Sequence, residues 1–234
     1  MSRSWSVLDF ILIWLGGLVG TGIFYAAGVA FADPNWTIAL SLAGQYMGNL
    51  GVFWLITRYK PVSEIGLAIT PGDIAYIGLG LILQIALAVA FLPLTELLFP
   101  DGRPQQEVAD IIANADATWL KVSLVAAAVV LGPITEEIMY RGILLKALER
   151  WGKVLALVVS SLVFAVAHLA GLDSEQLWKS AAVFLPPLFI LAMVLAWITQ
   201  RTGRLGPAIF LHSGWNLLSA FVLLLPSDIL DQVG

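Results

Sequence analysis

The sequence predicts an all-helical protein that crosses a membrane several times. Hydrophobic residues make up 59% of the 234 residues and charged residues only 12%, against roughly 25% charged in an ordinary soluble domain. The mean hydropathy is +0.90. Because so few charged side chains cannot cover a water-soluble globule of this length, we expect lipid to contact most of the surface.

Apolar runs long enough to span a bilayer place the individual helices. A span needs about 20 apolar residues, because the hydrocarbon core is about 30 Å thick and a helix rises about 1.5 Å per residue. We expect seven spans, at residues 8–31, 37–57, 74–98, 118–135, 154–171, 179–199 and 205–225. The fourth continues as a more polar helix to residue 150. An eighth helix results if this stretch breaks near Gly132-Pro133 and its second part lies in the membrane interface.

Two observations support these bounds. The first run is too long for a signal peptide and ends without a small-residue cleavage pattern, so we expect it to be retained. Tryptophan prefers the membrane interface, and seven tryptophans fall near proposed span ends: Trp5, Trp36, Trp54, Trp119, Trp151, Trp178 and Trp197.

Glycines and polar side chains indicate how the spans pack. Gly16 with Gly20, and Gly44 with Gly48, have the small-xxx-small spacing that lets two helices approach closely. We expect this packing to be within one chain, with a dimer interface as the alternative. Other polar residues inside spans are interpreted as interhelical hydrogen-bonding groups: Gln45, Asn49, Gln84 and Glu96.

Basic residues predict the orientation, because loops rich in lysine and arginine stay cytoplasmic. With the N-terminus in the cytoplasm, nine basic residues lie on that side: Arg3, Arg58, Lys60, Arg141, Lys146, Arg150, Lys153, Arg201 and Arg204. The opposite side then receives the acidic loop with Asp101, Glu107, Asp110 and Asp116.

Net charge and cysteine content exclude several classes of function. The formal net charge is -4, so the chain lacks the basic field of a nucleic-acid-binding protein. With no cysteine in the chain, disulfides, thiolate catalysis and iron–sulfur clusters are excluded.

Three polar groups stand out at membrane depth, where an ionisable residue is expensive and indicates function. In GPITEEIMYRGILL, Glu137 and Arg141 are four residues apart in the acid-first order, so they can pair on a helix and leave Glu136 unpaired. The other two groups contain the chain's two histidines: His168 in VFAVAHLAG, and His212 with Asn216 in FLHSGWNLL.

A register argument brings the first two groups together. If residues 134–150 and 154–171 form an antiparallel hairpin, Glu136 and His168 lie at the same level. His212 lies about eight residues beyond Arg204, roughly 12 Å of helix below the cytoplasmic surface. We therefore expect both histidines to converge on Glu136 in a polar pocket open to the cytoplasm.

EEIMYR, FAVAH and HSGWN, in this order on successive spans, resemble the EExxxR, FxxxH and HxxxN signatures of the CAAX protease and bacteriocin-processing family, also called the Abi family. This is a family of glutamate-dependent intramembrane proteases, and nothing in the three motifs departs from its pattern. The resemblance covers about residues 118–225, whereas residues 1–117 carry no signature. We expect one membrane domain over 1–234, with a CAAX-protease-like helical bundle.

The resemblance implies a role for each motif residue. Glu136 would be the general base that takes a proton from the attacking water, and His168 would help to hold that water. His212 and Asn216 would donate hydrogen bonds to the tetrahedral oxyanion. The supporting residues are Glu137 and Arg141, which would hold the helix and the pocket wall, and Phe164, which we expect to pack against His168.

Other interpretations stay open at this point. A zinc site made of Glu136, His168 and His212 is the minor alternative to a site without cofactor. Asn216 taken alone is more typical of an interhelical hydrogen bond than of a catalytic role. Two alternative functions are not proteolytic: the protein is a proton- or ion-coupled transporter, or it is an inactive binding or immunity protein that shields a membrane partner.

We therefore expect an intramembrane endopeptidase that cleaves a membrane-associated peptide or protein without a covalent intermediate. The family's substrates include prenylated CAAX peptides and bacteriocin or signalling-peptide precursors. With no organelle-targeting segment in the sequence, we favour a bacterial cytoplasmic membrane and a peptide or small-protein substrate.

Overall fold

The computed structural model describes residues 4–31, 33–100, 111, 115, 117–172 and 176–224. Within these residues the chain forms helices and no β-strand. Six long α-helices are α1 (Val7–Val29), α2 (Pro34–Thr57), α3 (Tyr76–Leu98), α8 (Lys153–Ala167), α9 (Leu177–Thr202) and α10 (Gly206–Leu224). Short 3₁₀ turns flank α3 and α8: η1 (Val62–Ile65), η2 (Pro71–Ala75) and η6 (His168–Gly171).

One continuous helix, Thr118–Trp151, joins the first half of the chain to the second. It consists of α5 (Thr118–Ala126), the π-helical η3 (Ala127–Leu131), α6 (Gly132–Glu136), the π-helical η4 (Glu137–Leu145), α7 (Lys146–Leu148) and η5 (Glu149–Trp151). The helix runs through Gly132-Pro133 and does not divide there, contrary to the alternative that would give an eighth helix. Two π-helical stretches flank Glu136, and such stretches are frequent at functional sites.

The expectation of a polytopic all-helical membrane protein is confirmed. Among the described residues, six helices are long and apolar enough to cross a membrane, and each coincides with an expected span. Helix α2 is not among them. It packs along α1 but carries three polar residues, Gln45, Tyr46 and Asn49, in its middle. The expected count of seven spans is therefore not confirmed, although all seven expected helices are present.

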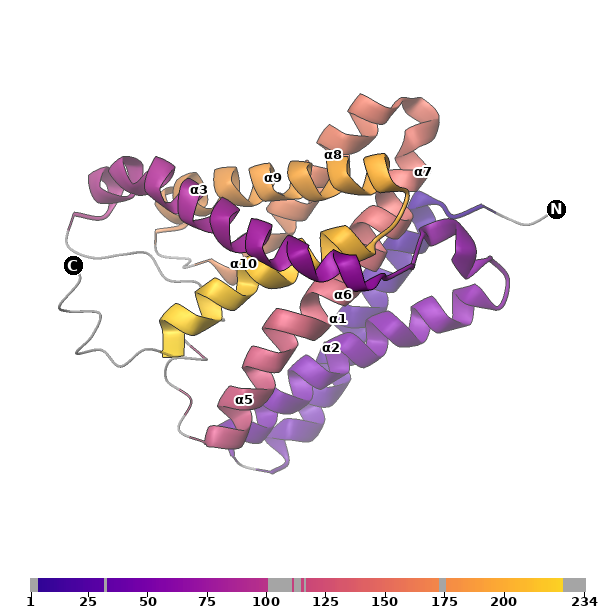
Figure 1. Ribbon diagram of the computed structural model, residues 1–234. Helices are drawn as coiled ribbons and strands as arrows, with labels where there is room; N and C mark the ends of the chain where they lie inside the picture. Colours follow the sequence, from indigo (N-terminus) through magenta and orange to yellow (C-terminus); the bar gives the residue numbers. More distant parts are fainter. Residues whose placement is uncertain are drawn as a thin grey trace.

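The long helix lies between two groups of helices (Figure 1). The α1–α2 hairpin covers one side of it, where α1 contacts η4 and α2 contacts α5 and α6. Helices α3, α8, α9 and α10 lie on the other side, where α8 and α9 contact η4 and α10 contacts η3 and α6. The second half of the long helix is therefore enclosed, and every residue from Glu137 to Leu145 is buried.

The segment between α2 and α3 fixes the start of α10. The backbone N–H groups of Leu205 and Gly206 donate to the carbonyls of Gly66 and Ala68, at 2.9 and 3.2 Å. Arg204 also donates to both carboxylate oxygens of Asp73, at 2.8 and 3.0 Å, and these hydrogen bonds raise the pKa of the Arg204 guanidinium. Because α10 is held at its first residues, the position of His212 two turns later is fixed as well.

Most of the expected cytoplasmic basic residues gather at one end of the bundle. Lys146 donates to the Glu64 carbonyl across this end, and Lys60 pairs with Asp9 at the start of α1. The starts of α1, α3 and α10 lie here together with the turn between the long helix and α8. Arg3 and the acidic residues Asp101, Glu107, Asp110 and Asp116 lie outside the described residues.

Glycines bring α1 and α2 into backbone contact. A Cβ atom on Gly20 would collide with the Gly44 carbonyl, and a Cβ atom on Gly48 would collide with the Gly16 carbonyl. The expected packing of these four glycines within one chain is confirmed. Asn49 reaches across the same interface and packs on Gly17.

We expect Gly48→Ala to lower the free energy of unfolding by about 1–3 kcal/mol, because its methyl group must separate two touching backbones. Gly51→Ala is the matched control on the same helix, since a Cβ atom there would meet nothing within 4 Å. It should raise stability by about 0.5–1 kcal/mol, because alanine favours the helical backbone. Thermal unfolding in detergent measures both changes. Equal stability of the two variants would contradict the close packing of α1 and α2.

Candidate active site

The centre of the structure is a buried ion pair between Glu137 and Arg141. Both side chains are enclosed, with 0% and 1% relative exposure, and Arg141 Nη1 donates to Glu137 Oε1 at 3.0 Å. The second guanidinium nitrogen, Nη2, donates to the Ala192 carbonyl of α9 at 3.3 Å. The guanidinium carbon also lies 4.5 Å from the centre of the Phe164 ring of α8. The pairing expected from the i, i+4 spacing is confirmed.

His212 connects α10 to this ion pair. Its Nδ1 lies 2.9 Å from Glu137 Oε1, the same oxygen that accepts from Arg141. Because a carboxylate paired with arginine only accepts, Nδ1 carries the proton. Nε2 then points to the other side of the ring, where Glu136 Oε2 lies 3.8 Å away, too far for a hydrogen bond.

The two consecutive glutamates have different surroundings. Glu137 is fully enclosed and bound to two cationic or donor groups, whereas the Glu136 side chain is 33% exposed. Glu136 Oε2 is itself buried and lacks a hydrogen-bond partner in the described part of the chain. Glu137 Oε2 also lacks a partner among the described residues, but Glu137 is enclosed, so Glu136 is the carboxylate that another molecule can reach.

His168 ends α8. Its backbone N–H bonds to the Ala165 and Val166 carbonyls as the helix tightens into η6, and its side-chain Nδ1 lies 2.8 Å from the Phe164 carbonyl. A carbonyl oxygen only accepts, so Nδ1 again carries the proton. In the neutral ring Nε2 is then an acceptor, the form needed to accept a hydrogen bond from water.

Asn216 donates a hydrogen bond to a backbone carbonyl of the long helix that has no donor within that helix. The Gly132 N–H bonds to the Ala127 carbonyl in the π-helical pattern. The next donor in this pattern belongs to Pro133, which has no N–H, so the Ala128 carbonyl lacks its helical donor. Asn216 Nδ2 donates to it at 2.8 Å. One N–H of the Asn216 amide is thus an interhelical bond, and the second is available to a ligand.

Phe164 lies between the two histidines and is fully buried. Its ring centre is 4.7 Å from that of His168 and 5.7 Å from that of His212. The contact with His168 is the one expected from the sequence, and the contact with His212 was not expected. Because the ring also covers Arg141, it separates the buried ion pair from the outer part of the site.

The structure brings most of the predicted residues together, but not all pairs. Glu136, Glu137, Arg141 and His212 form one connected group, and His168 joins it through Phe164. Among the described contacts, none joins Glu136 directly to His168. No three His, Asp or Glu side chains in the described ranges lie close enough together to hold a metal ion.

Sequence reasoning missed two features of the site. It did not predict that Glu137 binds His212, because a contact between distant spans has no signature in the spacing of either motif. It also placed nothing from residues 1–117 at the site. The structure puts Tyr46 of α2 next to Gly132, with its hydroxyl near Glu136. Its only signal is a polar position in the middle of a span.

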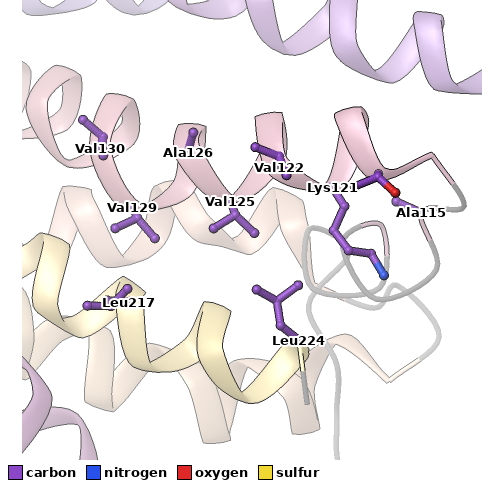
Figure 2. A pocket seen from close by; sticks show the side chains of 10 residues that line it. Ala115, Lys121, Val122, Val125, Ala126, Val129, Val130, Leu217 and Leu224 are labelled. Carbon is purple, nitrogen blue, oxygen red and sulfur yellow. The ribbon is translucent and has the colours of Figure 1, made fainter. Parts of the chain in front are cut away.

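An apolar groove of about 430 Å³ leads along the long helix toward the site. Val122, Val125 and Val129 line one wall, and Leu217 and Leu224 of α10 line the other, as Figure 2 shows. Lys121 and Ala115 lie at the outer end. At the inner end, Val129 follows Ala128 and Leu217 follows Asn216, so the groove stops beside the Asn216–Ala128 bond.

Comparisons with known proteins agree with this site. Residues 118–218 match the family model described as Type II CAAX prenyl endopeptidase Rce1-like. An uncharacterized 24.3 kDa protein of Escherichia coli is 26% identical over 196 residues, which are 82% of this chain and 73% of that protein. No solved structure matches the chain. The family model covers the long helix, both histidines and Asn216, and it confirms over residues 118–218 the resemblance to CAAX proteases that the three motifs predict.

Proposed function

We propose that this protein is an intramembrane endopeptidase in which Glu136 activates the attacking water. The observation that carries this proposal is the contrast between the two adjacent glutamates. Glu137 is bound by Arg141 and His212, whereas Glu136 is 33% exposed and faces His212 Nε2. One carboxylate thus builds the site and the other is free to react.

The reaction follows from these positions. Glu136 takes a proton from a water molecule as the water oxygen attacks the carbonyl carbon of the peptide bond. His168 Nε2 accepts a hydrogen bond from the second O–H of the water and so orients it; this hydrogen stays on the oxygen that joins the carbonyl carbon. A tetrahedral oxyanion forms, and the C–N bond then breaks as the protonated Glu136 returns its proton to the leaving amine. No covalent intermediate with the protein forms.

Asn216 and His212 are the donors that we propose for the oxyanion. The second N–H of the Asn216 amide is available, and its first N–H anchors the amide to the Ala128 carbonyl. His212 donates from Nε2 when its ring is protonated at both nitrogens, since Nδ1 already donates to Glu137. Donors held rigidly in this way stabilise the transition state at little reorganisation cost.

The groove supports a substrate that reaches the site from within the bilayer. Its walls are aliphatic and it ends beside Asn216, so an extended apolar segment or chain in the groove would place its neighbouring peptide bond near Glu136. The substrate we propose is a membrane-associated peptide or small protein. A prenylated peptide is one such substrate, and the match to a CAAX prenyl endopeptidase family supports it.

The basic end of the bundle supports the expected orientation. Lys60, Lys146 and Arg204 lie there, and the positive-inside rule assigns that end to the cytoplasm. We propose that the N-terminus is cytoplasmic and that the protein lies in a bacterial cytoplasmic membrane.

We expect Glu136→Gln to lower proteolysis by about 100-fold or more, because glutamine cannot accept the water proton. Peptide termini in membranes of cells with wild-type protein are compared with those of cells with the variant at equal expression. A defined terminus should disappear and its uncut precursor accumulate. Glu96→Gln, an exposed glutamate of α3, is the control and should leave the termini unchanged. Unchanged termini in Glu136→Gln, with the deletion phenotype rescued, would favour a binding or immunity protein.

We expect Val122→Trp to raise KM by about ten-fold with kcat unchanged, which corresponds to ~1.4 kcal/mol of lost substrate binding. The indole would fill the outer half of the groove, far from Glu136. Val89→Trp on α3 is the control, because Val89 and Val122 are 65% and 63% exposed and only Val122 lines the groove. If both variants have the wild-type KM, the substrate does not use this groove.

We expect the purified protein to contain no stoichiometric zinc and to keep its activity after chelation. The proposed chemistry needs only the carboxylate of Glu136 and hydrogen-bond donors. Elemental analysis of the protein, followed by activity measurements with and without a zinc chelator, makes the test. Zinc at one equivalent, together with activity that chelation removes and zinc restores, would replace this mechanism with a metal-activated water.

A further inference from the structure

Tyr46 is a polar residue of α2 that faces the candidate active site. It is half-buried, and α2 reaches the long helix where α6 begins. Its hydroxyl lies near Glu136, which lies on a different helix far along the chain. The first half of the chain thus brings a hydroxyl to the reacting carboxylate.

Gly132 lies between these two groups. A Cβ atom built on Gly132 would lie 3.3 Å from the Tyr46 hydroxyl oxygen and 3.8 Å from Glu136 Oε1. The Tyr46 hydroxyl and Glu136 Oε1 therefore approach the same point of the long helix, where glycine places no side chain between them. A water molecule that bridges buried groups needs two to four polar partners, and these two oxygens supply two of them.

The two oxygens of the Glu136 carboxylate face different groups. Oε2 lies on the His212 side, 3.8 Å from Nε2, and Oε1 lies on the Gly132 side. Tyr140 and Arg141 of the long helix also lie near Glu136. Arg141 is committed to Glu137 and Ala192. Tyr46 is the group that approaches from the side opposite α10.

We propose that Tyr46 is a positioning residue of the active site, which holds Glu136 Oε1 by a hydrogen bond through a water molecule beside Gly132. The water accepts from the Tyr46 hydroxyl and donates to Oε1. Because the carboxylate is then held on the Gly132 side, Oε2 stays directed toward His212 and the substrate. The effect on catalysis rests on the proposed function. The link between Tyr46 and Glu136 is independent of that function.

Infrared spectroscopy tests the link without any substrate. The difference between the spectra of wild-type protein and Glu136→Gln isolates the carboxylate stretching bands of Glu136. The same difference recorded in a Tyr46→Phe background should show these bands shifted, because the carboxylate has lost a donor. Tyr25→Phe, a tyrosine of α1 that is 55% exposed, is the control and should leave the bands in place. Unshifted bands in Tyr46→Phe would overturn the proposal.

Kinetics test the consequence for catalysis. Tyr46→Phe keeps the ring and should lower kcat by about ten-fold, as expected for one lost hydrogen bond to a charged group, with KM unchanged. Gly132→Ala should have the same effect with the hydroxyl present, because its methyl group would lie 3.3 Å from the Tyr46 hydroxyl oxygen and displace it from Glu136. Gly78→Ala, where a Cβ atom would meet nothing within 4 Å, is the control. Wild-type kcat in both Tyr46→Phe and Gly132→Ala would overturn the role in positioning.

The outcomes separate this proposal from the proposed function. If Glu136→Gln retains full activity, the protease mechanism fails, and shifted bands in Tyr46→Phe would still establish the Tyr46–Glu136 link. If Glu136→Gln is inactive and Tyr46→Phe lowers kcat without shifting the bands, the hydroxyl does not act on Glu136 and the proposal is wrong.

Discussion

A guanidinium buried inside a membrane protein must be neutralised and hydrogen-bonded from every side, and the arrangement of the second half of this chain depends on that requirement. Arg141 is 1% exposed. Glu137 of its own helix, the Ala192 carbonyl of α9 and the Phe164 ring of α8 surround it, and His212 of α10 binds the same Glu137 oxygen. Four helices therefore meet at one charge, and a shift of the long helix, α9 or α10 would break a hydrogen bond of the buried ion pair.

The buried arginine also explains why Glu136 and Glu137 have different surroundings. Residues one apart on a helix point in different directions, so a core-facing Glu137 leaves Glu136 directed away from the ion pair. His212 lies between the two, with Nδ1 on Glu137 and Nε2 facing Glu136, the proposed base. The carboxylate that orients the imidazole is thus the same one that neutralises Arg141.

The helices and the motif residues were predictable from the sequence, whereas most of their contacts were not. Apolar runs predicted α1, α3, α9 and α10 to within a few residues, because lipid imposes length and composition on each span. The i, i+4 spacing predicted the Glu137–Arg141 pair. The Glu137–His212 and Asn216–Ala128 bonds depend on how distant spans dock, and the π-helical stretches have no composition of their own. Tyr46 was missed for the same reason: it stands alone in a span without a motif.

Pro133 destabilises the long helix taken alone but contributes to the packing of that helix against α10. An ordinary residue at position 133 would offer an N–H to the Ala128 carbonyl and make the helix better as an isolated element. That carbonyl would then be shared between the N–H of residue 133 and Asn216, and the hydrogen bond that Asn216 makes from α10 would weaken. The long helix thus lacks one backbone hydrogen bond, and the Asn216 side chain of α10 supplies the donor in its place. The long helix therefore has an unpaired carbonyl until α10 packs against it, and the hydrogen bond from Asn216 favours this one pairing of the two helices.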